Sequence, residues 1–207
     1  MSPKVTYTFI GALCIGAFLH IDGASCALAA DAVRVRGVVI DLDGSTLKVR
    51  TREGVDSVLM LKAGWKITGV AAASVDDIKT GDFVGIASLP KTGGGDGALE
   101  VLIFPAALKG TGEGTYPWDL KPKSSMTNAT VSNAVKDVEG PTITLQYQGQ
   151  EKKISIANGT PVVTFAPATQ SDLKAGATVF VPAERDADGV ITASFVVVGA
   201  NGVVPPM

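Results

Sequence analysis

One pattern of residues occurs twice in the chain, and it constrains the fold more than any other feature. In the first copy, Gly37-Val-Val-Ile-Asp-Leu-Asp-Gly44 leads into Ser45-Thr-Leu-Lys-Val-Arg50. In the second copy, Ala129-Thr-Val-Ser-Asn-Ala-Val-Lys-Asp-Val-Glu-Gly140 leads into Pro141-Thr-Ile-Thr-Leu-Gln146. After each closing glycine, apolar residues alternate with polar ones. Such alternation is typical of a strand with one face on a core and the other in water.

The match between the two copies continues at a nearly constant offset. Trp65-Lys-Ile-Thr68 corresponds to Thr160-Pro-Val-Val163, and residues 75–81 correspond to residues 170–176. Each copy then shows a strongly apolar stretch, a glycine-containing turn and a last alternating stretch. Several short strands separated by turn signals predict a small β-barrel in each copy.

The corresponding segments 75–81 and 170–176 share the element Asp-(Ile/Leu)-Lys-x-Gly. A Ser or Asp before such a stretch can cap one helical turn, and the glycine then ends it in a left-handed conformation. We expect Ile78 and Leu173 to close one end of a barrel from these turns. The alternative is a cation site at Asp76, Asp77 and Asp172, but these acids lack the loop spacing of a calcium site.

The composition is that of a folded globular protein. Of 207 residues, 46% are hydrophobic and 18% are charged, and the formal net charge is -2. The 24 glycines and 11 prolines indicate many turns, which suit short strands better than long helices. The positive residues are scattered and often lie beside acidic ones, whereas nucleic-acid binders carry clustered Lys and Arg. We therefore expect no nucleic-acid partner.

Residues 1–30 have the organisation of a signal peptide. Residues 1–4 are short and positive, residues 5–19 are apolar, and Ala27-Leu-Ala-Ala30 offers small residues at a cleavage point. The apolar run is shorter than the roughly 20 residues of a transmembrane helix. We expect a periplasmic or secreted protein with no membrane span after cleavage. Lipidation at Cys26 is an alternative, although no Leu stands three residues before it.

The predicted signal peptide contains the only histidine, His20, and both cysteines, Cys14 and Cys26. A mature chain cut near Ala30 would therefore have no disulfide and no Ser-His-Asp or Cys-His catalytic group. It would also lack the usual ligands of zinc and blue-copper sites. We expect no cofactor, no metal site and no enzymatic activity. A hydrolase that depends on two carboxylates, such as a glycosidase, remains an alternative.

A connector lies between the two copies, with a Gly-rich first half and a Pro-containing second half. It lacks the Lys-Ser or Lys-Thr ending of a phosphate-binding loop. Aromatic residues in loops often form binding surfaces, so this region is the predicted binding site. The alternative is that its aromatic side chains pack across the two barrels and fix their orientation. The candidate binding residues are Tyr116, Trp118, Asp119, Met126 and Asn128.

The methionines allow a second functional hypothesis. Thioethers favour copper(I), so Met60, Met126 and Met207 could serve a metal-handling accessory protein if they converged with carboxylates. Scattered methionines are more often gap-fillers in a core or mobile surface residues. Convergence of these three side chains in space would favour the metal hypothesis.

Three features together resemble a known family: the repeated Gly-Val-Val…Asp-Gly-x-x-Leu-x-Val opening, Asp-Ile-Lys-Thr-Gly81, and the connector Pro-Trp-Asp-Leu120…Met-Thr-Asn128. They resemble exported bacterial proteins that carry "domain of unknown function 5666". The resemblance covers most of the mature chain. It implies small OB-like β-barrels and export, and it supplies neither an activity nor catalytic residues.

The sequence thus predicts an all-β protein with two tandem small OB-like β-barrels, short helical turns and an ordered connector. The predicted boundaries are 1–30 for the signal peptide, 32–108 for the first barrel, 109–126 for the Gly/Pro-rich connector, 127–200 for the second barrel and 201–207 for the tail. OB barrels commonly bind extended polymers on one sheet face. We expect an exported, non-enzymatic binding or interaction module for a periplasmic polymer or protein partner. The alternatives are a periplasmic metal-handling accessory protein and a carboxylate-dependent hydrolase.

Overall fold

The structure is a computed structural model that describes residues 30–135 and 140–206. The predicted signal peptide, with its cysteines and histidine, lies outside the described residues except for Ala30. The described chain is all-β, as predicted, with short 3-10 turns between strands. Within the described ranges, no helix is long and apolar enough to cross a membrane. The elements are β1 (Asp31–Asp43), β2 (Thr46–Thr51), β3 (Asp56–Ala72), η1 (Val75–Asp77), β4 (Phe83–Pro90), β5 (Asp96–Ile103), η2 (Ala106–Leu108), β6 (Gly114–Pro117), β7 (Ser125–Val135), β8 (Thr142–Tyr147), β9 (Gln150–Ser155), β10 (Val162–Ala166), η3 (Gln170–Asp172), β11 (Thr178–Arg185), β12 (Ile191–Gly199) and η4 (Ala200–Gly202).

Five strands form a closed barrel, here called the first barrel. Its strands follow the order β12-β11-β1-β2-β3, with each neighbouring pair antiparallel. The barrel closes because β12 and β3 pair in parallel over eight residue pairs. Alternate residues of each strand point inward, as the period-2 pattern predicts. The fully buried side chains include Leu47, Val49, Leu59, Val181 and Val196.

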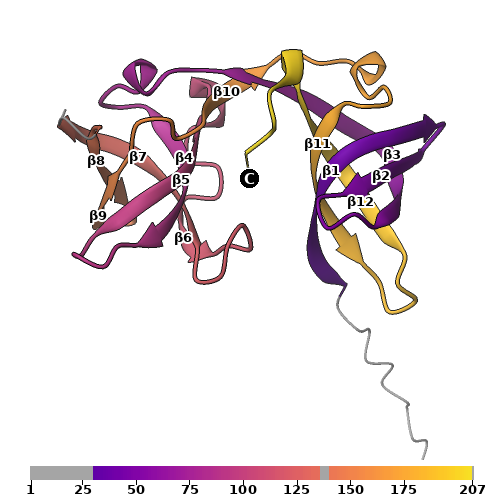
Figure 1. Cartoon of the computed structure of the whole chain (residues 1–207), viewed down its shortest axis with the longest axis horizontal. Coiled ribbons are helices and arrows are strands. Elements are labelled where there is room, and N and C mark those ends of the chain that lie inside the picture. The colour runs from indigo at the N-terminus through magenta and orange to yellow at the C-terminus, as the bar shows by residue number, and fades with distance from the viewer. Residues whose placement is uncertain (1–29, 136–139, 207) are drawn as a thin grey trace, which may run out of the picture.

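A second set of strands, here called the second ring, follows the order β5-β4-β7-β8-β9. Its neighbouring strands are antiparallel, and β5 also pairs with β9 in parallel. This closing contact comprises two residue pairs, Asp96 with Ile154 and Gly97 with Ser155. Its own apolar core contains Val84, Ile86 and Leu145, all fully buried. Figure 1 shows the first barrel and the second ring as two lobes.

The strand pairing corrects the predicted tandem arrangement. The first barrel takes β1–β3 from the first copy of the repeat and β11–β12 from the second copy. The second ring takes β4 and β5 from the first copy and β7–β9 from the second. Segments 32–108 and 127–200 therefore do not each form a barrel. The physical reason is that β3 does not bend back. It runs on from the first barrel to Ala72, where it pairs with β10.

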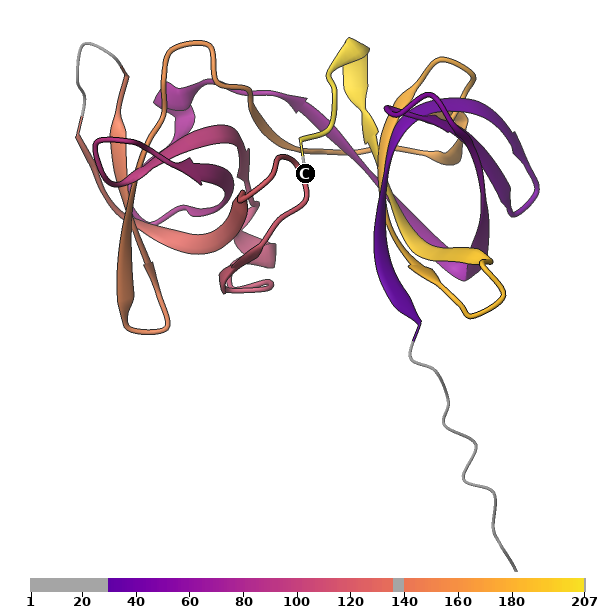
Figure 2. The same cartoon turned by 60° about the horizontal axis from the view of Figure 1, so that its bottom comes forward.

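A third apolar cluster lies where the chain crosses between the lobes. The end of β3 pairs antiparallel with β10, and β10 pairs in parallel with β5. Figures 1 and 2 show these crossing segments as the bridge between the lobes. The shared sheet and this cluster join the first barrel to the second ring. The buried members of the cluster are Val70, Leu102, Val163, Phe180 and Val197.

The two predicted helical turns are confirmed as the 3-10 turns η1 and η3. The backbone N–H of Ser74 donates to the Asp77 carboxylate at 2.7 Å, and that of Thr169 donates to Asp172 at 2.7 Å. These acids cap their turns, which is the structural role predicted for the element. Among the described residues, no group of three or more His, Cys, Asp or Glu is placed to hold a metal ion.

Gly81 and Gly176 have the predicted positive φ, 95° and 89°. They do not end the 3-10 turns, whose C-caps are Ile78 and Leu173, but lie in the turn that follows each of them. Ile78 is buried in the core of the second ring, and Leu173 is buried in the core of the first barrel. Each side chain therefore packs into a core, but the two cores are exchanged relative to the prediction. Ile78 comes from the first copy and serves the second ring, which follows from the same crossing of β3.

Candidate ligand groove between the lobes

The connector is folded against β7 rather than loose. Strand β6 pairs with the start of β7, so Tyr116 lies opposite Met126. After β6, the backbone N–H of Trp118 donates to the carbonyl of Ser124 at 2.8 Å. The Ser124 hydroxyl, which is buried, donates to the Trp118 carbonyl at 2.9 Å. These bonds hold residues 118–124 as a fixed loop, and the predicted connector is therefore ordered.

Trp118 belongs to the connector and packs against the first barrel. The guanidinium of Arg34 stands 4.0 Å from the centre of its ring, which is a cation–π contact. Tyr116 meets the same ring edge-on at 6.0 Å between centroids, and Phe180 of β11 lies 6.5 Å away. Trp118 thus packs across the two lobes, which is the structural alternative that the sequence left open.

Asp119 ties the connector to the first barrel by charge. Its carboxylate lies 2.8 Å from Nη2 of Arg36 and 3.8 Å from Nη1 of Arg34, and its carbonyl accepts from Arg52 at 3.3 Å. Burial raises the pKa of Asp119, but the hydrogen bond from Arg36 and the charges of Arg36 and Arg34 together lower it by more than burial raises it. The net pKa lies below the ordinary value, so Asp119 is an ionised anchor at neutral pH.

A small cavity of about 70 Å³ lies beside Trp118. In its wall, the side-chain amide of Asn128 donates to the Tyr116 hydroxyl at 3.1 Å. The indole Nε1 of Trp118 is buried and has no hydrogen-bond acceptor among the described residues. Burial raises the pKa of Tyr116, opposed by the charge of Arg34. The cavity lining is Gly85, Glu100, Leu102, Phe104, Tyr116, Trp118, Met126, Asn128 and Pro206.

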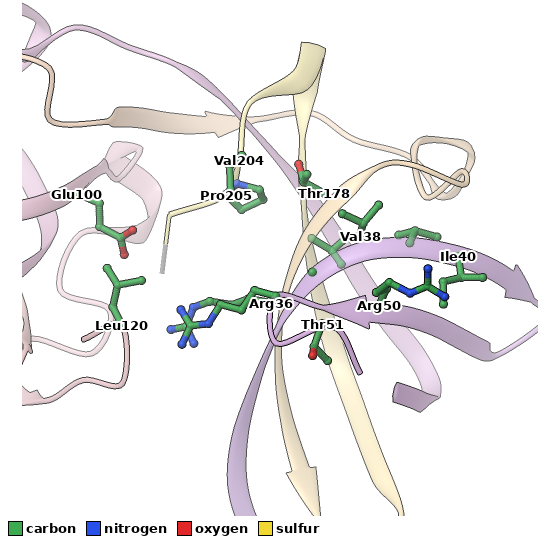
Figure 3. Close-up of a pocket in the computed structure, with 15 residues that line it drawn as sticks. Arg36, Val38, Ile40, Arg50, Thr51, Glu100, Leu120, Thr178, Val204 and Pro205 are labelled. Atoms are coloured by element: carbon green, nitrogen blue, oxygen red, sulfur yellow. The ribbon is translucent and has the colours of Figure 1, made fainter. Parts of the chain in front are cut away.

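A much larger groove of about 730 Å³ opens between the first barrel and the second ring. Val38 and Ile40, on the outer face of β1, are 40% and 36% exposed and contribute apolar surface to it. Figure 3 shows Glu100 and Leu120 across the groove from Val38, Ile40 and Arg50. The volume lies within the range of roughly 300–1,000 Å³ that is typical of ligand sites.

Three arginines give the groove a cationic rim: Arg36, Arg50 and Arg52. Arg36 pairs with Asp119 of the connector, whereas Arg50 and Arg52 pair with acids of the first barrel. Arg50 Nε lies 2.8 Å from Asp56, and Arg52 Nε lies 2.7 Å from Glu53. These pairs hold the guanidinium groups in place at the rim. A ligand that carries a carboxylate would meet oriented N–H donors here.

Residues 203–206 lie between the lobes at one end of the groove, where Figure 1 marks the C-terminus. The hydroxyl of Thr178 donates to the carbonyl of Val203 at 2.9 Å. Pro205 and Pro206 are both buried. Pro205 lines the large groove and Pro206 lines the small cavity, so this segment borders both spaces.

Four of the five predicted site residues come together in the structure. Tyr116, Trp118, Met126 and Asn128 line the small cavity, whereas Asp119 lies against Arg36 outside it. Of the three methionines in the metal hypothesis, the two that the structure describes lie in different lobes. Met126 is buried on β7 of the second ring, while Met60 is partly exposed on β3 of the first barrel. Met207 lies outside the described residues.

Sequence reasoning did not identify the groove residues Arg36, Val38, Ile40, Glu100 and Pro205. One signal was present in β1, where Arg34, Arg36, Val38 and Ile40 occupy alternate positions. The arginines mark that side as the outer face, so two apolar residues on it required a covering partner. Glu100 and Pro205 gave no comparable signal, because their role depends on how the lobes face each other.

No family model, no curated protein and no solved structure matches this chain. The chemistry of the groove and the cavity is therefore the basis for inferring what the protein binds.

Proposed function

We propose that the protein is an exported, non-enzymatic binding module that holds an extended ligand in the groove between its lobes. The observation that carries this proposal is the groove itself, which is about 730 Å³ in volume and combines an apolar floor with a rim of oriented arginines. Apolar surface that lines a concave site with a few placed polar groups is typical of ligand-binding sites.

The apolar floor supports the proposal energetically. Val38 and Ile40 retain more than a third of their exposure on a strand whose inward residues are well buried. Covering each of them with a ligand would contribute about 1 kcal/mol, at roughly 25 cal/mol per Å² of apolar surface. A contiguous exposed apolar patch rimmed by charge marks a binding site more often than an ordinary surface.

The strand order gives a second line of support. In the first barrel, a three-stranded meander, β1–β3, is closed by β12 in parallel and by β11. Five-stranded Greek-key barrels of the OB type have a similar construction, and they bind extended polymers on the face of their second and third strands. Arg50 of β2 lines the groove on that outer face.

The acids that pair with the groove arginines are not arranged as proton donors. A glycosidase needs one carboxyl group whose pKa is raised so that it can donate a proton. The pKa values of Asp119, Asp56 and Glu53 instead lie below their ordinary values. In Asp56 and Glu53 a hydrogen bond from an arginine is the main cause. In Asp119 burial raises the pKa, and the hydrogen bond from Arg36 together with the charges of Arg36 and Arg34 outweighs it. These carboxylates are suited to positioning the arginines.

The proposal can be tested with 8-anilinonaphthalene-1-sulfonate, a fluorescent apolar anion that matches the floor and rim. We expect saturable binding at one site and at least a tenfold loss of affinity in Val38→Asp or Ile40→Asp. The matched control is Val190→Asp, because Val190 is 44% exposed but does not line the groove. Binding that does not saturate, or that is as strong in Val38→Asp as in the unmodified chain, would contradict the proposal.

A further inference from the structure

We infer that the groove and the adjoining small cavity recognise a proline-containing peptide in the polyproline II conformation, and that residues 203–206 occupy one end of this site as a built-in ligand. The inference rests on the proposed function, because it names the class of ligand for the same groove. The segment Val-Val-Pro-Pro is the molecule's own example of what this site accepts.

The backbone of this segment is extended. Val203 has φ −67° and ψ 132°, close to the polyproline II values of about −75° and +145°. Val204 and Pro205 each precede a proline, which disfavours helical backbone and favours the extended region. A polyproline II segment makes no internal hydrogen bonds, so its carbonyls are free to accept from a partner. The Val203 carbonyl does so from Thr178.

The surroundings of the segment are aromatic. Pro206 lines the small cavity together with Phe104, Tyr116 and Trp118. Trp118 in turn lies beside Phe180 of the first barrel. Aromatic-lined grooves are the usual receptors of proline-rich peptides, because the rigid peptide loses little entropy when its rings pack on aromatic faces. Aromatic side chains from both lobes thus contribute to this surface.

An unsatisfied donor marks where a peptide carbonyl would be received. The Nε1 of Trp118 is buried in the described structure, and no acceptor among the described residues takes its hydrogen. An indole N–H can only donate, and buried donors are nearly always hydrogen-bonded in native proteins. Residues 203–206 do not supply that acceptor, so a free peptide that reached further into the cavity would make one hydrogen bond more than the built-in segment does. We therefore expect the indole N–H of Trp118 to donate a hydrogen bond to a backbone carbonyl of the peptide.

The open part of the groove indicates what the rest of the peptide looks like. The groove continues from Pro205 to the apolar floor at Val38 and Ile40 and to the rim at Arg50 and Arg52. A longer peptide would place an apolar side chain on this floor and an acidic side chain at the rim. The ligand class is therefore an extended peptide with a proline pair, an apolar residue and a carboxylate.

The structure also offers a way to release the built-in segment without shortening the chain. A Cβ atom at Gly199 would lie 1.6 Å from the Val203 carbonyl oxygen and 2.7 Å from the Thr178 hydroxyl. Gly199 itself has φ −75° and ψ 125°, which alanine adopts without strain. Gly199→Ala should therefore displace residues 203–206 while it leaves the backbone of β12 intact.

The experiment uses a fluorescein-labelled peptide with the sequence of residues 202–206, Gly-Val-Val-Pro-Pro, and a matched peptide with alanine at both prolines. Each is titrated, with fluorescence polarisation as the readout, against the unmodified chain, a variant that lacks residues 203–207, and full-length Gly199→Ala. A tethered segment competes at a local concentration in the millimolar range. We expect both variants to bind the proline peptide at least tenfold more tightly than the unmodified chain, and the alanine peptide at least tenfold more weakly than the proline peptide.

Trp118→Phe in the Gly199→Ala background should weaken binding at least fivefold. The control is Trp65→Phe, because Trp65 is partly buried against the core of the first barrel and lines neither the groove nor the cavity. Failure of both released variants to bind the proline peptide overturns the inference, and so does equal binding of the two peptides. If 8-anilinonaphthalene-1-sulfonate still binds the groove in those variants, the proposed function stands without this ligand class. If the dye also fails to bind, the proposed function fails with it. Should the shortened chain lose its circular dichroism spectrum, full-length Pro205→Asp supplies the second released variant.

Discussion

The first barrel and the second ring each combine strands from both predicted copies of the sequence pattern, but they use the chain differently. The second ring consists of one continuous stretch, from β4 to β9. The first barrel is discontinuous, because β11 and β12 return to it after the second ring is complete. The second ring is therefore inserted into the first barrel, and the two predicted sequence copies are not the units in space.

The two strand pairings that close these rings also differ. In the first barrel, β3 and β12 pair over eight residue pairs of backbone. In the second ring, β5 and β9 share two residue pairs, and side chains reinforce the contact. Asp96 lies 2.8 Å from Nζ of Lys152 and accepts a hydrogen bond of 2.8 Å from Ser88. The short β5–β9 pairing thus depends on the cluster of Asp96, Lys152 and Ser88, here called the polar clasp. The longer β3–β12 pairing depends on backbone hydrogen bonds.

The largest expected effect concerns fragments that follow one boundary or the other. We expect residues 73–162, which contain the second ring and its core, to fold alone into a cooperative unit. We expect residues 31–108, which follow the sequence repeat, to stay unfolded, because their strands belong to two different rings. Circular dichroism and thermal unfolding of both fragments test this. Cooperative unfolding of residues 31–108 would restore the tandem arrangement.

A core truncation in each region should sharpen the comparison. Leu59 and Leu145 are both fully buried, one in each core. Each Leu→Ala change should cost about 2–5 kcal/mol of stability in denaturant unfolding. In hydrogen exchange, Leu59→Ala should loosen the first barrel while β8 and β9 keep their protection, because the second ring is continuous. Equal loss of protection in both regions would show that they unfold as one unit.

The polar clasp should matter more than an exposed ion pair. Asp96 and Lys152 are less than a fifth exposed, whereas Lys62 and Glu184 on the first barrel are about half exposed. Asp96→Asn should cost about 1–3 kcal/mol, because it leaves a partly buried cation without its charged partner. Glu184→Gln should cost about 0–1 kcal/mol. Urea unfolding of the two variants gives the comparison, and similar costs would argue against the clasp.

The smallest expected effect is the pH dependence of the same clasp. Burial raises the pKa of Asp96, but the hydrogen bonds from Lys152 and Ser88 and the charge of Lys152 outweigh it, so its folded pKa lies below the ordinary value. A depressed folded pKa stabilises the protein above the unfolded value of about 3.9, and the stabilisation is lost as the pH falls below it. Stability measured from pH 6 to pH 3 should therefore decline less steeply in Asp96→Asn than in the unmodified chain. Parallel curves would mean that Asp96 contributes nothing to the acid response.

Much of the local structure could be predicted from the sequence. Alternating residues and glycine turns identified the strands, and the shared turn element located the buried Ile78 and Leu173. Strand partners could not be predicted, because alternation says which face is buried but not which strand lies beside it. The two predicted copies present equivalent partners, and the continuation of β3 past Gly69 to its pairing with β10 decides between them.

The candidate site was predictable in part for the same reason. Tyr116 of β6, Trp118 just after it and Asn128 of β7 lie close together in the chain, so their grouping could be predicted from the sequence. Val38, Glu100 and Pro205 come from three distant segments that meet because of the crossing strands. The groove is a property of the strand pairing, so it could not be seen before that pairing was known.

The insertion of the second ring also sets an order in time. As the chain is synthesised, β1, β2 and β3 emerge before the second ring, but their closing partners β11 and β12 emerge after it. Until then the meander has open edges, which can pair with other chains. The return of β11 and β12 is a long-range step, and such steps are slow in folding. Residues 203–206 follow β12 after the short turn η4. The groove and its built-in ligand therefore form at the same step, when the first barrel closes.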